Sequence, residues 1–343
     1  MELYQLRYFV AVADNGNFTR AAEQCSISQP SLSQQIKSLE SELGHKLFHR
    51  LGRRAVPTEA GQVFLERVRR ILLAVEDASK EQRDSPTLER RIKVGAAQTV
   101  APYLLPLALE RCRALHPNLL VHTHEDFRPE LVYGVTEGDL DLAIIPQPVK
   151  DARLSVEVLY SEPLLLVVGK AHPLATKPAI TARDLADESF VLLGHSSTLS
   201  AEIERFCGAH DFVPKLGHRC SQVSTVKALV ALGPGISILP RIAIRPDDKK
   251  SLVYRELSGR VPTREVLIVR HLQRYQTKGT ELFLQVLRTV VAELVATGET
   301  AAGPPAPATR IFPSAADAAV STGSTSSHST GSGSATPQAS SRP

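Results

Sequence analysis

The segment 18–43, FTRAAEQCSISQPSLSQQIKSLESEL, limits the fold of this chain more than any other stretch. Its pattern predicts two short helices joined by a tight turn. In the second helix, one apolar stripe at i, i+4, i+7 and i+11 faces a core and consists of Leu32, Ile36, Leu39 and Leu43. Ser28 is placed to cap this helix, and Pro30 suits its first turn, where a missing N–H costs nothing.

The opposite face of the second helix is polar but almost uncharged. Its residues are Gln29, Ser33, Gln34 and Lys37. Such side chains hydrogen-bond base edges or phosphates. Upstream, Asn17 is placed to cap the first short helix, and residues 6–13 predict a third helix that completes a three-helix core. The alternative is an ordinary helical hairpin with a solvated side, although such a side more often carries Glu and Lys pairs.

The segment 46–56, KLFHRLGRRAV, follows this helix directly and is basic. It contains no acidic residue, and Gly52 stands where a β-hairpin would turn. Its basic residues are Lys46, Arg50, Arg53 and Arg54. An isolated run of this kind is usually a solvated loop, but beside a recognition-type helix it has the position of a wing that contacts the phosphate backbone or minor groove. Residues 1–58 are therefore predicted to form a winged helix-turn-helix that binds double-stranded DNA.

These residues resemble the N-terminal domain of LysR-type transcriptional regulators. The resemblance covers 6–61, including NFTRAAEQCSISQPSLSQQIKSLESELGHKLFHR and RAVPTEAG, and the order of later elements fits the family to about residue 297. It implies that Gln29, Pro30 and Ser33 lie at the major groove and the wing arginines on the backbone and minor-groove side. Thr19 and Ser31 are weaker candidates, because a cap or solvent exposure explains them equally well. The predicted DNA-contacting set is Gln29, Pro30, Ser33, Gln34, Lys37, Arg50, Arg53 and Arg54.

Composition agrees with a DNA-binding protein without identifying one. The chain has 343 residues, enough for two or three domains, and a formal net charge of +4. A pI near 8.9 is only mildly basic, so the local basic cluster carries the prediction. No apolar run approaches the ~20 residues of a membrane span, and the N-terminus is unlike a signal peptide. With four scattered cysteines, the protein is expected to be cytoplasmic.

Residues 58–84 predict one long linker helix. Its apolar stripe comprises Phe64, Val68, Ile71 and Val75, with Leu65 and Leu72 beside them. The helix would be roughly 39 Å long, more than so small an N-terminal domain could cover, so a second copy of the chain is the expected partner. Half-sites of such a dimer lie about 34–36 Å apart or a multiple of that. The family resemblance implies tetramers as well. The polar segment 85–90 is expected to be a hinge.

From residue 91 the pattern changes to alternating strands and helices, which is typical of an α/β domain with a parallel sheet. Strands are expected at 92–97, 119–125, 141–145, 163–169, 190–193, 236–240 and 264–270. Helices are expected at 102–115, 128–138, near 181–185, and at 198–207, 223–233 and 278–296. Two such lobes joined by crossing strands resemble periplasmic binding proteins, the effector-domain fold that the family resemblance also implies. Lobe I is placed at 91–160 plus 264–297, and lobe II at 161–263.

The ends of these strands mark the expected ligand site. In open α/β sheets, ligands bind at the carboxyl ends of strands, where helix N-termini direct N–H groups into the cleft. The residues there are Gln98, Thr99, His195, Ser196, Ser197, Thr198, Ser224 and Thr225, with Phe127 and Pro146 less well supported. Hydroxyls and N–H groups favour a small anion such as a carboxylate, although a helix cap explains each Ser or Thr equally well. A small-molecule effector bound between the lobes is expected to change their packing and the spacing of the DNA-binding domains.

A thiol-based redox sensor is the main alternative. The segments APYLLP, GDLDLAI and GPGISILP resemble the branch of the family that contains peroxide sensors, in which a reactive cysteine follows a Gly-His pair. Here Ser196 follows Gly194 and His195, so that thiol is missing. Cys207 and Cys220 leave open a different disulfide switch. Buried cysteines that act as small hydrophobes are the default interpretation.

Metal, cofactor and enzyme functions have less support. Zinc accepts residues such as Cys207, His210, His218 and Cys220, but their spacing is not a common finger pattern. The motifs G-x-S-x-G, the P-loop and G-x-G-x-x-G after a strand are missing, so neither catalysis nor a cofactor is expected. A DNA-binding domain fused to an α/β enzyme remains a rival hypothesis. RNA polymerase is a further candidate partner, and a membrane is not. The Ala-, Ser-, Thr-, Gly- and Pro-rich tail 298–343 is expected to be disordered.

Two substitutions test the assigned DNA surface. Arg53→Ala removes a phosphate contact, so it should weaken binding to all sequences and lower the salt slope by about 1. Gln29→Ala removes a base contact, so it should relax the preference at one base pair by roughly 1–3 kcal/mol. Anisotropy titrations at several salt concentrations, with a selected site and its single-base variants, measure both. If both variants lose only non-specific affinity, the recognition face is wrongly assigned.

Overall fold

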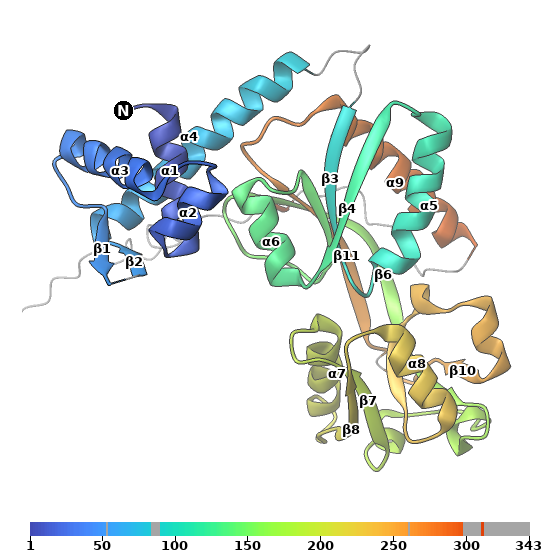
Figure 1. Cartoon of the computed structure of the whole chain (residues 1–343). Coiled ribbons are helices and arrows are strands. Elements are labelled where there is room, and N and C mark those ends of the chain that lie inside the picture. The colour runs from blue at the N-terminus through green and yellow to red at the C-terminus, as the bar shows by residue number, and fades with distance from the viewer. Residues whose placement is uncertain (53, 84–89, 260, 298–309, 312–343) are drawn as a thin grey trace, which may run out of the picture.

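The structure is a computed structural model that describes residues 1–52, 54–83, 90–259, 261–297 and 310–311. It has three parts, namely a small N-terminal domain, one long helix and a C-terminal part made of two lobes (Figure 1). The predicted hinge 85–90 lies outside the described residues except for its last position. The predicted tail 298–343 also lies outside them, except for a two-residue strand, β12 (Arg310–Ile311), which pairs with β6 (Leu154–Gly169).

The N-terminal domain is built from three helices and a hairpin. Its elements are α1 (Leu3–Asn15), α2 (Phe18–Gln24), α3 (Gln29–Leu43), β1 (Phe48–Leu51) and β2 (Arg54–Pro57). The predicted apolar stripe of α3 is confirmed, because Leu32, Ile36 and Leu39 are fully buried. Both predicted caps are present, because Asn17 and Ser28 accept N–H groups in the first turns of α2 and α3.

The hairpin of β1 and β2 is the predicted wing. Its turn passes through Gly52 at φ +62°, a left-handed conformation that favours glycine. The buried carboxylate of Glu40 fixes this hairpin to α3, because it accepts the backbone N–H groups of Leu47 at 2.9 Å and Phe48 at 3.3 Å. Its other oxygen accepts a hydrogen bond from the Lys46 ammonium at 3.2 Å. Glu40 therefore sets where the wing leaves α3.

The long helix α4 (Glu59–Arg83) follows the wing without a loop. The hydroxyl of Thr58 accepts the N–H of Gly61 at 3.0 Å and donates to the carbonyl oxygen of Lys46 at 2.7 Å. Glycine is required at position 61, because a Cβ atom there would lie 2.1 Å from the carbonyl oxygen of Leu47. The start of α4 is thus packed directly against the chain that enters the wing.

The apolar stripe of α4 is only partly available to another chain. Val68 is fully buried in the core of the N-terminal domain, and Phe64 packs against that core. The expectation that this domain is too small to cover the stripe is therefore wrong for the first half of the helix, because α1 and α4 pack along each other. Val63 and Ile71 remain 57% and 40% exposed.

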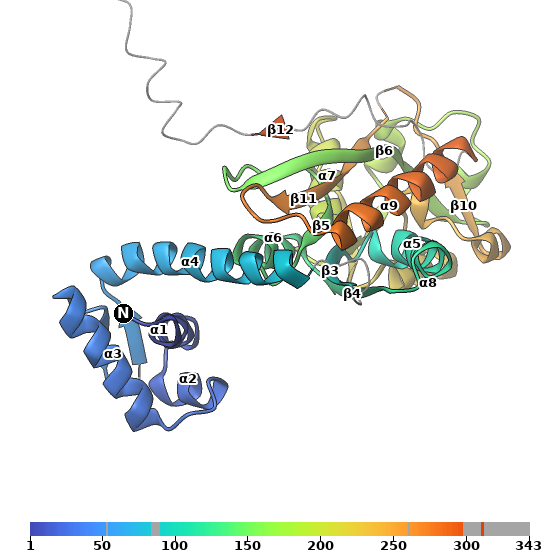
Figure 2. The same ribbon diagram turned by 90° about the horizontal axis from the view of Figure 1, so that it is seen from above.

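Lobe I of the C-terminal part is one sheet with helices on both faces. Its strands are β3 (Arg90–Ala97), β4 (Leu119–Asp126), β5 (Leu142–Pro146), the first half of β6, and β11 (Thr263–His271). They lie in the order β6-β11-β5-β3-β4. Its helices are α5 (Ala101–Leu115), α6 (Arg128–Glu137) and α9 (Lys278–Ala296). On β3, Gly95 faces the α6 side and Ile92 faces α9, so α6 lies opposite α5 and α9 (Figure 2).

Lobe II is smaller and less regular. Its strands are the second half of β6, β7 (Ser189–Leu193), β8 (Lys215–Cys220), β9 (Ser237–Pro240) and β10 (Leu252–Arg255). Its helices are α7 (Thr198–Gly208) and α8 (Val223–Leu232), with the 3-10 turns η1 (Pro173–Ala175), η2 (Ala182–Leu185), η3 (Arg241–Ala243) and η4 (Pro246–Lys250). The helix expected near 181–185 is therefore a single 3-10 turn, and β8 and β10 were not expected.

The strand β6 crosses from one lobe to the other. It pairs antiparallel with β11 as far as Pro163 opposite Thr263, and with β9 from Leu164 opposite Pro240. The predicted strand 163–169 is only its second half. Two lobes joined by a crossing strand are confirmed, but the sheet is mixed rather than parallel, because β11 runs antiparallel to both β5 and β6. Among the described strands, β3 pairs parallel with β4 and β5, and β7 with β8, while a single parallel bridge joins Phe190 to Ile236.

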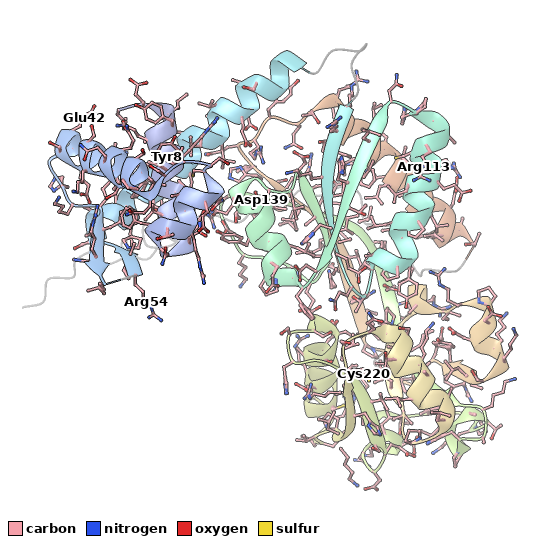
Figure 3. The ribbon with its side chains drawn as sticks, viewed as in Figure 1. Tyr8, Glu42, Arg54, Arg113, Asp139 and Cys220 are labelled. Carbon is pink, nitrogen blue, oxygen red and sulfur yellow. The ribbon has the colours of Figure 1, made fainter. Side chains whose placement is uncertain are left out.

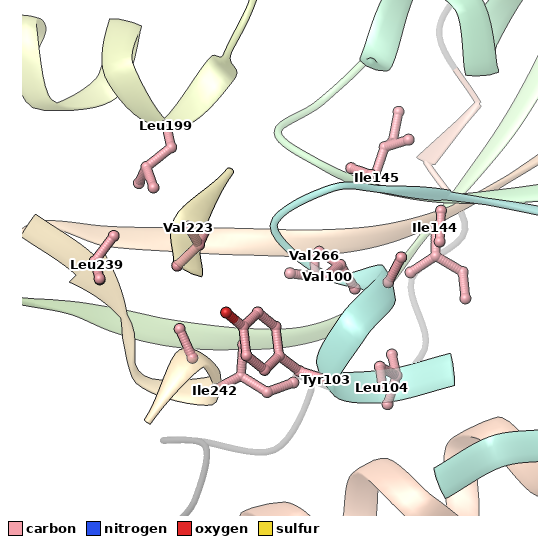
Figure 4. Close-up of a cluster of buried hydrophobic side chains, with 14 of the residues drawn as sticks. Val100, Tyr103, Leu104, Ile144, Ile145, Leu199, Val223, Leu239, Ile242 and Val266 are labelled. Carbon is pink, nitrogen blue, oxygen red and sulfur yellow. The ribbon is translucent and has the colours of Figure 1, made fainter. Parts of the chain in front are cut away.

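Apolar side chains of both lobes form one continuous cluster where the lobes meet (Figure 4). Tyr103 of α5 projects into this cluster beside Ile242 of lobe II. The guanidinium of Arg245, also in lobe II, lies 4.9 Å from the centroid of the Tyr103 ring. The same guanidinium donates to the carbonyl oxygen of Pro102 at 2.7 Å. The lobes are therefore packed against each other as well as joined by strands.

Glu40→Ala should loosen the wing while the rest of the chain stays folded. The buried N–H groups of Leu47 and Phe48 would lose their acceptor, which costs about 1–3 kcal/mol. Hydrogen exchange at these two amides should then be faster by about fivefold to 150-fold. The matched control is Glu42→Ala, because the Glu42 carboxylate is exposed and pairs with the N-terminal ammonium. Equal exchange rates in the two variants would contradict the role assigned to Glu40.

Candidate nucleic-acid interface and effector cleft

The predicted recognition face of α3 is open to solvent. Its exposed residues are Gln29, Pro30, Gln34 and Lys37, and Ser33 beside them is half-buried. Arg50 of β1 is held against this face, because its Nη1 donates to the hydroxyl of Ser33 at 3.1 Å. Its guanidinium carbon also lies 4.5 Å from the centroid of the Phe18 ring, a cation–π contact. One arginine of the wing is therefore already oriented along the recognition helix.

The other residues predicted to contact DNA differ in their solvent exposure and in their hydrogen bonds within the protein. Arg54 is exposed and points away from the protein (Figure 3), whereas Arg53 lies outside the described residues. The Ser31 hydroxyl lies 2.8 Å from that of Ser28, so it belongs to the cap of α3. Thr19 is exposed in the first turn of α2. The surface is polar and cationic, as DNA requires, and the role of each residue in it stays a prediction.

A second polar site lies where the lobes meet. It is a cavity of about 20 Å³, enough for about one water molecule. Its lining residues are Ala97, Gln98, Thr99, Asp126, Phe127, Arg128, Leu193, Ser196, Ser197 and Thr198. Five of the eight predicted effector residues therefore come together here, and Phe127 joins them. They come from the loops that follow β3, β4 and β7.

Three predicted effector residues do not line this cavity. His195 is exposed in the loop after β7, and Ser224 and Thr225 are exposed in the first turn of α8. Ser224 donates its hydroxyl hydrogen to the side-chain oxygen of Gln222 at 3.3 Å. Pro146 is buried at the end of β5 and also lies off the cavity lining. A role for these four residues in effector binding stays a prediction.

Two helices, α6 and α7, begin at the cavity without a side-chain cap, and a third, α5, begins two residues after Thr99, which lines it. The N-cap residues of α5, α6 and α7 are Val100, Phe127 and Ser197, and none of the three makes a side-chain capping hydrogen bond. Helices elsewhere vary, since α2, α3 and α9 are each capped by an Asn, Ser or Thr side chain, whereas α8 also begins without a side-chain cap. First-turn N–H groups and the positive end of the helix dipole attract an anion. The cavity therefore combines two such ends, with a third beside it.

Arg128 is a cavity residue that the sequence prediction omitted. Its Nη2 donates to the carbonyl oxygen of Pro148 at 2.5 Å, while its buried Nε has no hydrogen-bond partner among the described residues. Burial lowers the pKa of this guanidinium, which still remains a cation at neutral pH. The rule that selected Gln98 also applies here, because Arg128 follows β4 directly and opens α6. Asp126 carries the opposite charge, but its carboxylate accepts the N–H of Phe127 at 2.8 Å.

A fully buried ion pair holds one wall of the cavity. Arg264 of β11 donates through Nε and Nη2 to one oxygen of Glu162 on β6, at 2.9 and 2.8 Å. Its Nη1 donates to the hydroxyl of Thr99 at 2.8 Å. The second oxygen of Glu162 accepts the N–H of Ile242 in lobe II at 2.8 Å. Burial and the Glu162 carboxylate together raise the pKa of the nearby Tyr160 hydroxyl. Thr99 is therefore held rigidly at the cleft.

A weaker polar contact crosses between the lobes at the opposite wall. Gln147, which follows β5 and has φ +67°, donates its side-chain N–H to the carbonyl oxygen of Thr198 at 3.4 Å. Beside it, burial raises the pKa of the Glu202 carboxyl on α7. One oxygen of Glu202 is buried without a hydrogen-bond partner in the described structure. Neither residue was predicted, because nothing in the local sequence brings the two loops together.

The cysteines proposed for a redox switch are poorly placed for thiol chemistry. Cys207 is fully buried at the end of α7, and burial raises its pKa to about 12. Cys220 in lobe II is buried too (Figure 3), and burial raises its pKa. The thiolate is the reactive form, so burial disfavours reaction at both side chains. Their packing favours the default interpretation as small hydrophobic residues.

The zinc and enzyme alternatives gain no support from the geometry. Across the described residues, no three His, Cys, Asp or Glu side chains gather as metal ligands, and this includes the pairs Cys207 with His210 and His218 with Cys220. The cavity lining contains serines and one aspartate but no histidine or lysine that could act as their base.

A winged helix-turn-helix joined in one chain to a two-lobed ligand-binding domain is the architecture of a class of transcription regulators. Two family models match the chain. The model "Bacterial regulatory helix-turn-helix protein, lysR family" matches residues 3–62, and the model "LysR substrate binding domain" matches residues 86–292. The chain belongs to the LysR family of DNA-binding transcription regulators. Within the described residues, no helix is both long and apolar enough to cross a membrane.

Individual relatives agree with this assignment. The DNA-binding transcriptional dual regulator OxyR of Escherichia coli K12 is 32% identical over 272 residues, which is 78% of this chain and 89% of that protein. The structure of full-length OxyR from Pseudomonas aeruginosa is 28% identical, covers 89% of this chain and 99% of that one, and has a TM-score of 0.66. The structure of full-length CbnR in complex with its target DNA is 24% identical with a TM-score of 0.57 and shows the shared fold.

Alkylation rates test whether the buried cysteines are reactive. At pH 8, iodoacetamide should modify Cys207 in the native chain slower than in urea by a factor on the order of 10³, because its thiolate forms only as the pH approaches 12. Mass spectrometry of timed samples gives the rate at each cysteine. Cys25, which is half-buried, is the internal control and should react faster. Rapid modification of native Cys207 would restore the redox alternative.

Proposed function

We propose that DNA binding by this LysR-type regulator is gated by a small anion that binds between the lobes, and that the protein acts as a dimer in the cytoplasm. The division of labour follows the ranges expected from the sequence, with 1–58 for DNA, 58–84 for dimerisation and the two lobes for the effector. The contact residues are those that gather on the exposed face of α3, on the wing and in the cleft.

The convergence of two uncapped helix N-termini on one cavity, with a third beside it, carries this proposal. An anion there would accept N–H groups from α6 and α7 at once, with the first turn of α5 beside it, and would sit near the Arg128 guanidinium. Each donor is fixed within its own lobe, so the reorganisation that binding requires is a movement of the lobes and not a refolding of the helices. Lobe I supplies two of the helices and lobe II supplies the third. An anion in the cavity therefore stabilises the arrangement in which the lobes are close.

Self-association is proposed through the part of α4 that the chain itself leaves open. An apolar groove of about 480 Å³ runs along the start of α4 and the end of α3. Its lining residues are Leu43, His45, Leu47, Glu59, Ala60, Val63, Phe64 and Arg67. The exposed Val63 and Ile71 continue this surface along α4. A second copy that presents the same helix would cover it by the same contacts.

Thermal unfolding of the full chain tests the anion site. A panel of small carboxylates, sulfate and phosphate at constant ionic strength should contain at least one anion that raises the midpoint for the wild type and not for Arg128→Ala, because ligands stabilise the state they bind. Arg113→Ala is the matched control, since Arg113 is an exposed arginine of lobe I (Figure 3) and should leave the shift intact.

Two outcomes would count against the proposal. Anions that shift both arginine variants and the wild type equally would reveal a general salt effect and no specific site. A panel in which no anion acts selectively would show that the uncapped helix ends serve another purpose. If one anion does act selectively, the same anion should also change the footprint of the wild-type protein on a DNA fragment that was selected with the full chain.

A further inference from the structure

The helix α6 spans the whole distance from the effector cleft to the linker helix. Its first residue, Arg128, lines the cavity between the lobes, and its last, Glu137, contacts α4. Ten helical residues measure about 15 Å. Figures 1 and 2 show α6 between the sheet of lobe I and the N-terminal part of the molecule. One short rigid element therefore touches both functional parts of the chain.

At its C-terminal end, α6 enters an ion-pair chain that reaches the DNA-binding domain. One carboxylate oxygen of Glu137 lies 3.0 Å from Nε of Arg69 on α4 and forms an ion pair with it. Nη2 of the same arginine contacts the carboxylate of Asp14 on α1 at 2.5 Å. The Glu137 and Arg69 side chains are only 14% and 24% exposed, so solvent screens this contact less than a surface pair. The N-terminal domain, the linker helix α4 and lobe I thus meet at the guanidinium of Arg69.

A second contact joins the same end of α6 to the same helix. The buried guanidinium of Arg274 donates to Asp77 of α4 at 3.2 Å and to the carbonyl oxygen of Gly138 at 2.8 Å. Gly138 ends α6 at φ +87°, and a Cβ atom there would lie 2.3 Å from the side chain of Leu73. The left-handed φ therefore favours glycine here, and a larger residue would also displace the ends of the Leu73 and Arg274 side chains.

The surface between these helices is polar and loosely filled. A cavity of about 180 Å³ separates α1, α4 and the end of α6, and its lining includes Asp14, Arg69, Tyr133 and Glu137. Ion pairs around such a cavity fix how α6 lies against α1 and α4, but they can break and form with other partners without disrupting a packed core. This kind of contact suits two parts that must dock in more than one way.

From these contacts we infer that α6 transmits the state of the cleft to the DNA-binding domain of the same chain, with Glu137 and Arg69 as positioning residues. The inference rests on the proposed function, because it requires a cleft whose occupancy changes. A ligand that draws Arg128 toward the cavity displaces α6 as a unit, since helices move as rigid bodies. Glu137 then shifts against Arg69, and the angle between the lobe and the N-terminal domain changes.

A mutant cycle on DNA affinity tests this coupling without a ligand. The four proteins are the full-length wild type, Arg128→Ala, Glu137→Gln and the double variant, titrated on a fragment selected with the wild type. Arg128→Ala perturbs the cleft end of α6, and it should change the Kd for DNA by about fivefold or more in the wild-type background. In the Glu137→Gln background the same substitution should change Kd by less than about twofold.

Matched variants separate coupling from a general effect on the helix. Glu130→Gln removes an exposed carboxylate from the same helix and should leave the effect of Arg128→Ala intact. Arg69→Gln breaks the ion pair from the other side and should abolish the effect as Glu137→Gln does. In Arg128→Ala, hydrogen exchange should also increase in residues 137–140 and 69–77, which lie beyond the cleft.

Several results would overturn the inference. Equal changes of Kd in both backgrounds, or no change in either, would show that α6 does not couple the two sites. Loss of the effect in Glu130→Gln would show that any charge on α6 suffices. Failure of the proposed anion site is read separately, from the thermal shifts, which do not depend on Glu137.

Discussion

The buried ion pair of Arg264 and Glu162 is the interaction on which the rest of the ligand domain depends. Both side chains are wholly removed from water, a state that is costly unless every donor and acceptor is used. Arg264 meets this condition by binding Glu162 and Thr99, and Glu162 by accepting the N–H of Ile242 as well. The pair therefore ties β6 to β11, the loop before α5 to both strands, and lobe II to all three. Removing either partner would leave the other as an uncompensated buried charge at the point where the strands pass from one lobe to the other.

The linker helix is shared between two bodies and is not a free rod. Its first half belongs to the N-terminal domain, because Val68 is part of that domain's core. From its middle onward it is bound to lobe I, through Arg69 and Asp77. Val63 and Ile71 are the exposed large apolar side chains among those described on α4, and their face is open to another chain. In a dimer built on that face, α4 of each chain would still hold the DNA-binding domain against lobe I of the same chain. A change in the position of lobe I would therefore alter the position of the DNA-binding domain on its half-site in both chains.

Local features of the fold were predictable from the sequence, and long-range ones were not. The caps at Asn17 and Ser28, the stripe of α3, the turn at Gly52 and the bounds of α9 depend on residues within a few positions of one another, so pattern and propensity suffice. The first half of β6 was missed because it buries Glu157 and Glu162, which local patterns assign to surfaces. Arg264 and Thr99 are 165 positions apart, and only the completed topology brings them together. Strand ends determine position, so Gln98, Thr99 and 196–198 could be expected together from the sequence, and they do line one cavity, while their role in binding stays a prediction. The same rule selects Arg128, which the sequence analysis overlooked.

Ser196 stands at the position where the resemblance to peroxide sensors implies a reactive cysteine, so the anion that we propose would bind there reversibly. Reversible binding shifts an equilibrium only by the difference in affinity for two states. The cavity of about 20 Å³ holds little more than a water molecule. An effector as large as a carboxylate therefore has to move the lobes as it enters, and the contacts that would yield are the weak ones, such as Gln147 to Thr198, before the buried Arg264 pair. Because α6 begins at this cavity and ends on Arg69, the same movement that admits the ligand changes the contact that orients the DNA-binding domain.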